Sequence, residues 1–531
     1  MIKLSTKQTK RLVSIHGWSG VFLGLLLYVV LLTGTLAVFA SDIGTWSAGG
    51  MKSHEPLRQP LDHTIRALAH EMPQEYLEEI TVFYNSAGHI VVFFHTHAVN
   101  PEGTFDEKGV LTELHPESHR PIAQREGFGT ELFGADPAGA LDEFLVELHV
   151  NLHLPDPWGL YATGLLGFLM LVSAISGILI HRHLIADLFV APRPWNRLLH
   201  ARDRHNLAGT WTLPFAILLA FTGAFLSFAL SLGFPLLSQI AFSGDQFAMM
   251  EALVGTGYEE NAQPAELANL DLMLSLSAQH AGSPPESFVI SNYGRADTQV
   301  IVFHPPKDGA MVGAQNTFDG ISGSYLGLKP GIGTQPSLGN WVFELILPLH
   351  FGTFAGLLSQ LVWFALGLAA CYVTLSGQQL WLDRRLDDAN WCVLRRLVQI
   401  VGYGLPLAIL GSTYGFFLSL PAKQTLLWTP LGFCLLGLAS IGLGVLIREK
   451  ELASKAFHVA MTVLLVLLPM ARIAAGGPNW IWALSSNNVS IVLFDTILIL
   501  IGLCFFFTIS RIKPFVLLEK QTLEPKAGHE Q

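Results

Sequence analysis

The sequence predicts a polytopic α-helical membrane protein with about eight transmembrane helices and two small α+β extracytoplasmic domains. Three observations lead to this fold class. Hydrophobic residues make up 51% of the 531 positions and charged residues only 14%, a balance outside that of ordinary soluble domains. Long apolar stretches recur along the chain. Two long acidic segments, residues 41–157 and 233–349, separate the first stretch from the second and the third from the fourth.

Eight stretches approach the length of about 20 apolar residues that is needed to cross a roughly 30 Å hydrocarbon layer. They run near residues 18–40, 158–180, 206–232, 350–377, 397–419, 426–447, 456–475 and 488–510. The first follows Lys7, Lys10 and Arg11, as the apolar part of a signal peptide would. It exceeds the about 7–15 residues of a cleavable signal, so we expect an uncleaved anchor.

Charge placement predicts the orientation, because Lys and Arg accumulate in short cytoplasmic segments. Of the 31 basic residues, 20 lie in the two termini and in the short segments 181–204, 378–396 and 448–455, whereas segments 41–157 and 233–349 hold 30 of the 41 acidic residues. Both termini are therefore expected in the cytoplasm of a bacterial cell, with the chain in its inner membrane. The expected units are 1–40 (N-terminus and first span), 41–157 (first periplasmic domain), 158–232 (second and third spans with a cytoplasmic loop), 233–349 (second periplasmic domain), 350–396 (fourth span and a cytoplasmic loop) and 397–531 (a block of four spans and a cytoplasmic tail).

Each long acidic segment carries the pattern of a helix followed by a β-hairpin. In the first, a helical stretch at 62–71 precedes alternating strands between residues 80 and 94, which are broken at Asn85-Ser86-Ala87-Gly88. In the second, a helix near 265–279 precedes strands at 288–292 and 299–303. The segments therefore look like two copies of one small α+β unit.

The spans around these segments repeat as well. His16 and Gly20 of the first span match His205 and Gly209 of the third with the same spacing of 4, and Thr33-Gly34 and Thr222-Gly223 both follow their histidine by 17 residues. The second and fourth spans also share two motifs. A Leu-His pair stands at the outer end of each, Leu148-His149 and Leu349-His350, and a Ser-Gly pair stands near the inner end, Ser176-Gly177 and Ser376-Gly377. The duplicated unit is span, small domain, span, used twice in the same orientation.

The duplication pairs histidines by membrane face, with His16 and His205 at the cytoplasmic face and His149 and His350 at the outer face, where each is expected to begin a span. Two imidazoles at each face are the axial ligands that a haem iron takes. The four are predicted to ligate haem b, two haems per chain. His153, one turn after His149, and His181 and His183 at the inner end of the second span are the alternative ligands. Polar anchoring at the membrane interface is the other interpretation of each histidine taken alone.

Other clusters give weaker indications. His95 and His97 share one strand face in the first acidic segment but show no third metal ligand, so a solvated acidic domain is expected there. Arg448, His458 and Arg472 in the last four spans form no chemical pattern. None of the four cysteines lies in the long acidic segments, and no Cys-x-x-Cys-His attachment site or Gly-x-Gly-x-x-Gly motif occurs, so c-type haem attachment and a nucleotide-binding domain are not expected.

The sequence resembles the PepSY-associated transmembrane helix family, which includes iron-regulated inner-membrane proteins and ferric-siderophore reductases. The likeness covers roughly residues 10–395 and rests on His16 through Thr33-Gly34, Glu147-Leu148-His149, Asp203-Arg204-His205 through Thr222-Gly223, and Leu347-Pro348-Leu349-His350 through Ser376-Gly377-Gln378-Gln379-Leu380-Trp381.

The resemblance implies that the outer domains are PepSY-like and that the chain is a b-type dihaem protein. Such a protein would carry electrons across the membrane to reduce the Fe(III) of a ferric siderophore or other iron chelate. Its electron donor would be membrane quinol or a cytoplasmic reductase, and no nucleic acid is expected as a partner. A permease or accessory subunit for iron or siderophore uptake, and a PepSY-type regulator of a periplasmic partner, are the alternatives. The four spans after residue 397 depart from the family's four-span form and keep the permease alternative open.

Overall fold

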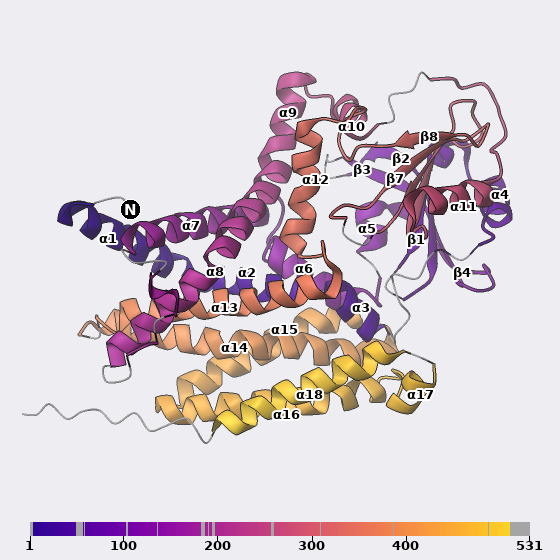
Figure 1. Cartoon of the computed structure of the whole chain (residues 1–531). Coiled ribbons are helices and arrows are strands. Elements are labelled where there is room, and N and C mark those ends of the chain that lie inside the picture. Colours follow the sequence, from indigo (N-terminus) through magenta and orange to yellow (C-terminus); the bar gives the residue numbers. More distant parts are fainter. Residues whose placement is uncertain are drawn as a thin grey trace, which may run out of the picture.

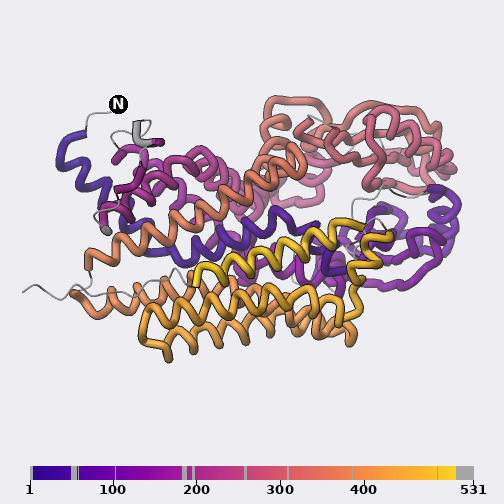
Figure 2. Tube along the Cα trace, turned by 60° about the horizontal axis from the view of Figure 1, so that its bottom comes forward, coloured from indigo at the N-terminus to yellow at the C-terminus, as the bar shows by residue number. Residues whose placement is uncertain are grey.

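The computed structural model describes residues 4–48, 57, 59–85, 87–101, 103, 105–134, 136–181, 186–189, 191–193, 197–255, 260–307, 310–385, 387–486 and 488–509. Long helices form an elongated body, and an antiparallel sheet with its own helices lies at one end of it (Figure 1). In Figure 2 the last helices of the chain lie along one side of the earlier spans. The protein is thus a membrane-spanning bundle with one sheet domain.

Seven helical stretches in the described part of the chain are long and apolar enough to cross a membrane, and the count is eight if one bent pair forms a single span. The span-forming helices are α7 (Trp158–Ile180), α8 (Arg197–Phe228), α13 (Gly356–Leu382), α14 (Ala389–Ser419), α15 (Thr425–Leu446), α16 (Lys450–Ala474) and α18 (Val489–Ile509). Many of their large apolar side chains are exposed, as lipid-facing residues are. This agrees with the prediction of about eight transmembrane helices.

The first span is broken rather than straight. Helix α1 (Thr6–Phe22) starts at Ser5, whose hydroxyl accepts a hydrogen bond from the Gln8 backbone while the Gln8 side chain accepts one from the Ser5 backbone. It is followed after one residue by α2 (Gly24–Ala37), which is inclined by 66° to it. The short helix α3 (Ala40–Ser47) then leads away from the span.

The third span is longer than a bilayer requires. Helix α8 continues through a π-helical turn, η3 (Ala229–Gly233), into α9 (Phe234–Ala241), giving 44 residues in one stretch. At about 1.5 Å per residue this stretch is roughly 66 Å long, about twice the hydrocarbon thickness. Its α9 end therefore projects beyond the bundle, toward the side on which α10 (Gln246–Val254) and the sheet lie (Figure 1).

All eight strands join in a single antiparallel sheet of order β4-β3-β2-β1-β5-β6-β7-β8. The first acidic segment supplies β1 (Glu79–Tyr84), β2 (Ile90–Val99), β3 (Phe105–Leu114) and β4 (Pro121–Phe128), and the second supplies β5 (Ser287–Ser291), β6 (Gln299–Phe303), β7 (Gln315–Asp319) and β8 (Tyr325–Leu328). The two sets meet where β1 pairs with β5, from Glu79 opposite Ser291 to Val82 opposite Phe288. Each unit thereby covers an edge strand of the other, and an exposed edge strand would invite unwanted pairing.

The helices α4 (Asp62–Glu71) and α11 (Leu270–Ala281) pack their apolar residues into a common core with one face of this sheet. Their amino ends are capped reciprocally. Asp271 accepts a hydrogen bond from the Leu61 backbone N–H at 2.7 Å, and Asp62 accepts one from the Leu270 backbone N–H at 3.0 Å. The helix at 62–71 and the hairpin near 80–94 agree with prediction, and the second helix begins five residues later than expected.

Short helices complete the fold. Those between the strands and the spans are α5 (Gly129–Phe133), α6 (Ala140–Val150) and α12 (Leu338–Phe351); the remaining ones are η1 (Gln74–Leu77), η2 (Ala186–Phe189), η4 (Leu420–Ala422) and α17 (Trp480–Ser485). Helices α6 and α12 each return the chain from the sheet domain to a span. Their last turns hold two of the predicted functional histidines.

Candidate functional site

The first histidine pair joins the two halves of the duplication at the end of the bundle away from the sheet. His16 of α1 and His205 of α8 lie with their ring centroids 6.4 Å apart and their planes at 68°. His16 Nδ1 lies 3.0 Å from the Ser173 carbonyl oxygen and 3.2 Å from Ser176 Oγ, both on α7. His205 Nδ1 lies 3.1 Å from Ser376 Oγ on α13. Each ring is thus held by the second span of its own repeat.

The second pair lies toward the sheet. His149 and His350 have ring centroids 6.1 Å apart and planes at 29°. Both end a short helix, α6 or α12, instead of beginning a span as the sequence analysis expected. The physical reason is that each helix stops after its histidine and a new helix starts beyond an irregular turn, at Gly352 in the second repeat, where φ is +73°. His149 Nδ1 lies 2.9 Å from the Val30 carbonyl oxygen, and His350 Nδ1 lies 2.8 Å from Thr222 Oγ1.

These contacts favour Nδ1 as the protonated nitrogen of each ring. A carbonyl oxygen only accepts, so the Nδ1–H groups of His16 and His149 donate to Ser173 and Val30. The Ser376 and Thr222 hydroxyls also lie within hydrogen-bonding distance of the Val373 and Leu218 carbonyls, to which they can donate. In that arrangement the Nδ1–H groups of His205 and His350 donate to the hydroxyl oxygens. In all four rings the lone pair left for a ligand is on Nε2.

Glycines let the four rings approach the neighbouring helices closely. A Cβ atom at Gly34 would lie 2.5 Å from the ring of His149, and one at Gly377 would lie 2.9 Å from the ring of His205. At Gly223 the distance to His350 would be 3.2 Å, and at Gly177 the distance to His16 would be 3.4 Å. The Thr-Gly and Ser-Gly pairs found in the sequence are thus the places where the histidine rings rest.

The ring separations in both pairs are those that two imidazole ligands of one metal ion would have. With metal–nitrogen bonds of about 2.0–2.1 Å and ring centroids about 1.2 Å behind the nitrogen, imidazoles on opposite faces of one metal separate their centroids by about 6–6.5 Å. The observed separations are 6.4 and 6.1 Å. Metal-bound histidines commonly donate their other ring N–H to a carbonyl or a polar side chain, as all four do here.

The two pairs are well separated along the bundle. His205 and Thr222, the partner of His350, lie on the same helix 17 residues apart, which corresponds to about 25 Å of helix. This is close to the roughly 30 Å thickness of the hydrocarbon layer. The pairs therefore lie near opposite faces of the membrane.

The alternative ligands are placed differently. His153 lies beyond the end of α6, where its Nε2 is 3.0 Å from the Phe144 carbonyl oxygen and its ring stacks on Phe144 with centroids 4.5 Å apart, so its Nε2 contacts the helix and not its partner histidines. His181 is the C-cap residue of α7. His183 lies outside the described residues.

The sheet domain carries a second group of histidines, His95 and His97. The structure places Glu79 beside them, which was not predicted from the sequence. Glu79 on β1 lies 4.0 Å from both His95 Nε2 and His97 Nε2 on β2. Burial lowers the pKa of His95 to about 3 and raises the pKa of Glu79 to about 7. His95 is only 1% exposed, whereas the Glu79 and His97 side chains are 25% and 29% exposed, so the cluster lies at the edge of the buried core and partly faces solvent. Among the described residues, no group of three or more His, Cys, Asp or Glu side chains is arranged so that it could hold a metal ion.

An ionic network in the last spans, centred on Asp495, was not predicted from the sequence. Asp495 of α18 and Arg472 of α16 are 0% and 1% exposed, with Arg472 Nη2 2.7 Å from Asp495 Oδ2. The indole N–H groups of Trp46 and Trp480 each donate to Asp495 at 2.8 Å. A lone acidic residue inside an apolar span was the available signal. Because Trp46 belongs to α3, this network ties the C-terminal block to the first repeat.

Two comparisons with known proteins bear on this arrangement. A family model described as PepSY-associated TM region matches residues 13–384, a range that contains all four paired histidines and ends before α14. The chain is also similar to an uncharacterised protein of Pseudomonas aeruginosa, PA4219. The two are 29% identical over 289 residues, which cover 49% of this chain and 68% of the relative.

Proposed function

The chain belongs to the PepSY-associated TM region family, and on this basis we propose that it is a membrane haem protein that passes electrons across the bilayer to a ferric-siderophore or other iron chelate. The observation that carries the proposal is the geometry of the two histidine pairs. In both, the ring centroids have the separation required by a shared metal, and each Nδ1–H is already used. Two haem b groups, one per pair, are the proposed cofactors.

Bound at these positions, the haems would supply the reversible one-electron chemistry of iron. The chain's own contribution is placement. His16 and His205 would hold one group, while His149 and His350 would hold the other about 25 Å away along α8. The hydrogen bonds from each Nδ1–H fix the ring orientation and raise the basicity of Nε2, which favours the ferric state of the metal.

The proposed orientation of the chain in the membrane follows from the charge distribution. The short basic segments favour a cytoplasmic position for both termini, so we place the sheet domain in the periplasm and the chain in the inner membrane of a bacterium. The pair His149 and His350 is then the exit site, next to helices that return from the sheet domain. The acceptor would dock there, between the bundle and the sheet.

The sheet domain is expected to discriminate among acceptors by charge. Its two segments hold 30 acidic residues, so a neutral or cationic chelate is favoured over a strongly anionic one. Added salt should reduce this preference, because the Debye length is about 8 Å at physiological ionic strength.

The experiment is Fe(II) release by the purified, reduced protein. The full chain is reduced with dithionite, freed of excess reductant and mixed anaerobically with ferric chelates of different charge in the presence of a ferrous-specific dye. We expect re-oxidation of the haem spectrum to match dye formation, fastest with neutral or cationic chelates. His350→Ala should slow both signals, whereas His70→Ala on the exposed face of α4 should not. Haem that is re-oxidised by no ferric chelate would refute the reductase proposal and leave haem binding intact.

A further inference from the structure

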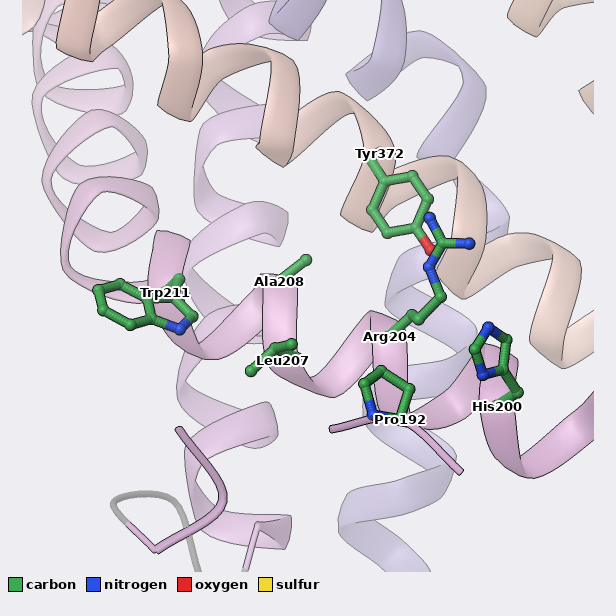
Figure 3. Close-up of a pocket in the computed structure, with 7 residues that line it drawn as sticks. All are labelled: Pro192, His200, Arg204, Leu207, Ala208, Trp211 and Tyr372. Atoms are coloured by element: carbon green, nitrogen blue, oxygen red, sulfur yellow. The ribbon is translucent and has the colours of Figure 1, made fainter. Parts of the chain in front are cut away.

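A pocket opens on the flank of the bundle next to the His16 and His205 pair. Figure 3 shows it between α8, α13 and the segment that contains Pro192. Its volume is about 570 Å³, and it is a shallow hollow on the side of the bundle rather than an enclosed cavity. Its lining is mainly apolar and aromatic, with Leu207, Trp211 and Tyr372, and it includes two nitrogen-bearing groups, His200 and Arg204.

Both walls of the pocket are continuous with the parts that hold His205. Arg204 is the residue before His205 on α8. Tyr372 precedes Val373 on α13, and the Val373 carbonyl accepts the hydrogen bond from Ser376 Oγ, which in turn receives the Nδ1–H of His205. Adjacent Cα atoms are about 3.8 Å apart, so the pocket and the proposed haem site lie at the same level of both helices, with the side chains of Arg204 and His205 on different faces of α8.

The polar groups of the pocket suit an aromatic ligand with hydroxyl groups. The Arg204 guanidinium lies 5.4 Å from the centre of the Tyr372 ring, so part of its charge is already directed at a π face. The His200 ring lines the pocket, and its buried Nδ1 has no hydrogen-bond partner in the described part of the chain. The Trp211 indole N–H donates to the Leu188 carbonyl at 3.1 Å. The rest of the Trp211 ring therefore lines the pocket as an apolar surface.

We propose that this pocket binds a lipid-soluble hydroquinone that donates electrons to the His16 and His205 site. This inference rests on the proposed function. A hydroquinone combines an aromatic ring, which the Tyr372 side chain would contact, with hydroxyl groups that hydrogen-bond to His200 and Arg204, and Trp211 would lie further along α8 beside the tail. Its isoprenoid tail would leave along α8, where the Trp211 side chain is 54% exposed on the surface of the bundle.

The reaction balances with the groups named. Oxidation of one hydroquinone to quinone breaks two O–H bonds and releases two protons and two electrons. One proton passes to the unpartnered nitrogen of His200 and the other to water at the pocket mouth. His16 and His205 would hold the ferric haem that accepts the two electrons one at a time, and the ferric chelate at the exit site would be the final acceptor.

An anionic lipid headgroup is the competing occupant. Its oxygens would accept hydrogen bonds from Arg204 and also from a ring N–H of His200. The lining, however, contains Arg204 as its single Arg or Lys side chain among the described residues, which is little charge for a phosphate. The hydroquinone uses the same two nitrogen-bearing groups without needing further charge.

Photolabelling tests the proposal without relying on turnover. The full chain is placed in nanodiscs of phosphatidylcholine, illuminated with an azido-quinone and mapped by mass spectrometry, with haem content measured on the same samples. We expect label on peptides that contain residues 200–211 or Tyr372, and competition by an unlabelled short-chain quinone. Leu207→Trp, which fills the pocket, should reduce this label by about tenfold or more. The matched control Leu236→Trp places the same bulk on an exposed site of α9 and should retain the label.

Each outcome decides a separate point. Equal labelling of the Leu207→Trp and control variants, or label confined to other helices, would overturn the hydroquinone site. Label that phosphatidylglycerol displaces and the short-chain quinone does not would assign the pocket to a lipid headgroup instead. Specific labelling of a chain that contains no haem would leave the pocket assignment standing and would refute the proposed function alone.

Discussion

Replacing Gly34 by alanine is expected to remove the haem nearer the sheet. A Cβ at this position would lie 2.5 Å from Cε1 and 2.8 Å from Nδ1 of His149. Carbon atoms in contact are about 3.5–4.0 Å apart, so the ring must move by about 1 Å. Metal–nitrogen distances at such sites vary by only about 0.2 Å around their usual value. The displaced ring would also lose its hydrogen bond to Val30.

Gly177→Ala is the matched control. Its Cβ would lie 3.4 Å from the ring of His16, an ordinary contact, and both glycines are within helices. Alanine is favoured over glycine inside a helix by about 0.5–1 kcal/mol, so neither variant should unfold its helix.

Haem per chain is measured by the pyridine haemochrome assay on purified protein from haem-replete cells, together with the Soret band. We expect about one haem for Gly34→Ala and about two for Gly177→Ala. Two haems with an unchanged spectrum in Gly34→Ala would refute the claim that His149 binds a metal in the observed position.

Three further predictions follow from individual contacts. His350→Ala should lose about one haem equivalent and retain the other, because the two pairs share no ligand; loss of both in the haemochrome assay would indicate instability instead of ligation. Asp495→Asn should leave Arg472 buried without a counter-charge and cost about 3–5 kcal/mol, seen as a lower unfolding temperature in detergent; an unchanged temperature would show that the network is dispensable. Burial raises the pKa of Glu79 to about 7, above its ordinary 4.5. The folded state therefore holds this proton more tightly than the unfolded state, and the free energy of unfolding falls by at most about 3 kcal/mol as the pH rises from 4.5 to 7. Glu79→Gln should therefore raise the unfolding temperature at pH 8 more than at pH 5, whereas the exposed Glu117→Gln should show no such difference.

The spans and the repeat were readable from the sequence because both depend on local patterns. Apolar length predicts a membrane helix, and the shared spacing of 17 from His16 to Thr33 and from His205 to Thr222 predicts equivalent positions in two copies. Whether equivalent residues from the two copies meet is a matter of tertiary packing. The structure brings them together in both pairs.

Other features depended on residues far apart in the chain. The single sheet exists because β1 pairs with β5, about 200 residues away, and nothing in either strand's alternation specifies that edge. The contact from Trp46 to Asp495 spans 449 residues. The bend between Phe22 and Gly24 interrupts an apolar stretch whose composition predicts one straight span.

Haem binding is the central claim, and the absorption spectrum of the purified full chain before and after dithionite tests it most directly. The account predicts a Soret band that shifts on reduction and about two haems per chain by pyridine haemochrome, as two bis-histidine sites require. A chain isolated from haem-replete cells with no Soret band and no haemochrome signal would contradict it.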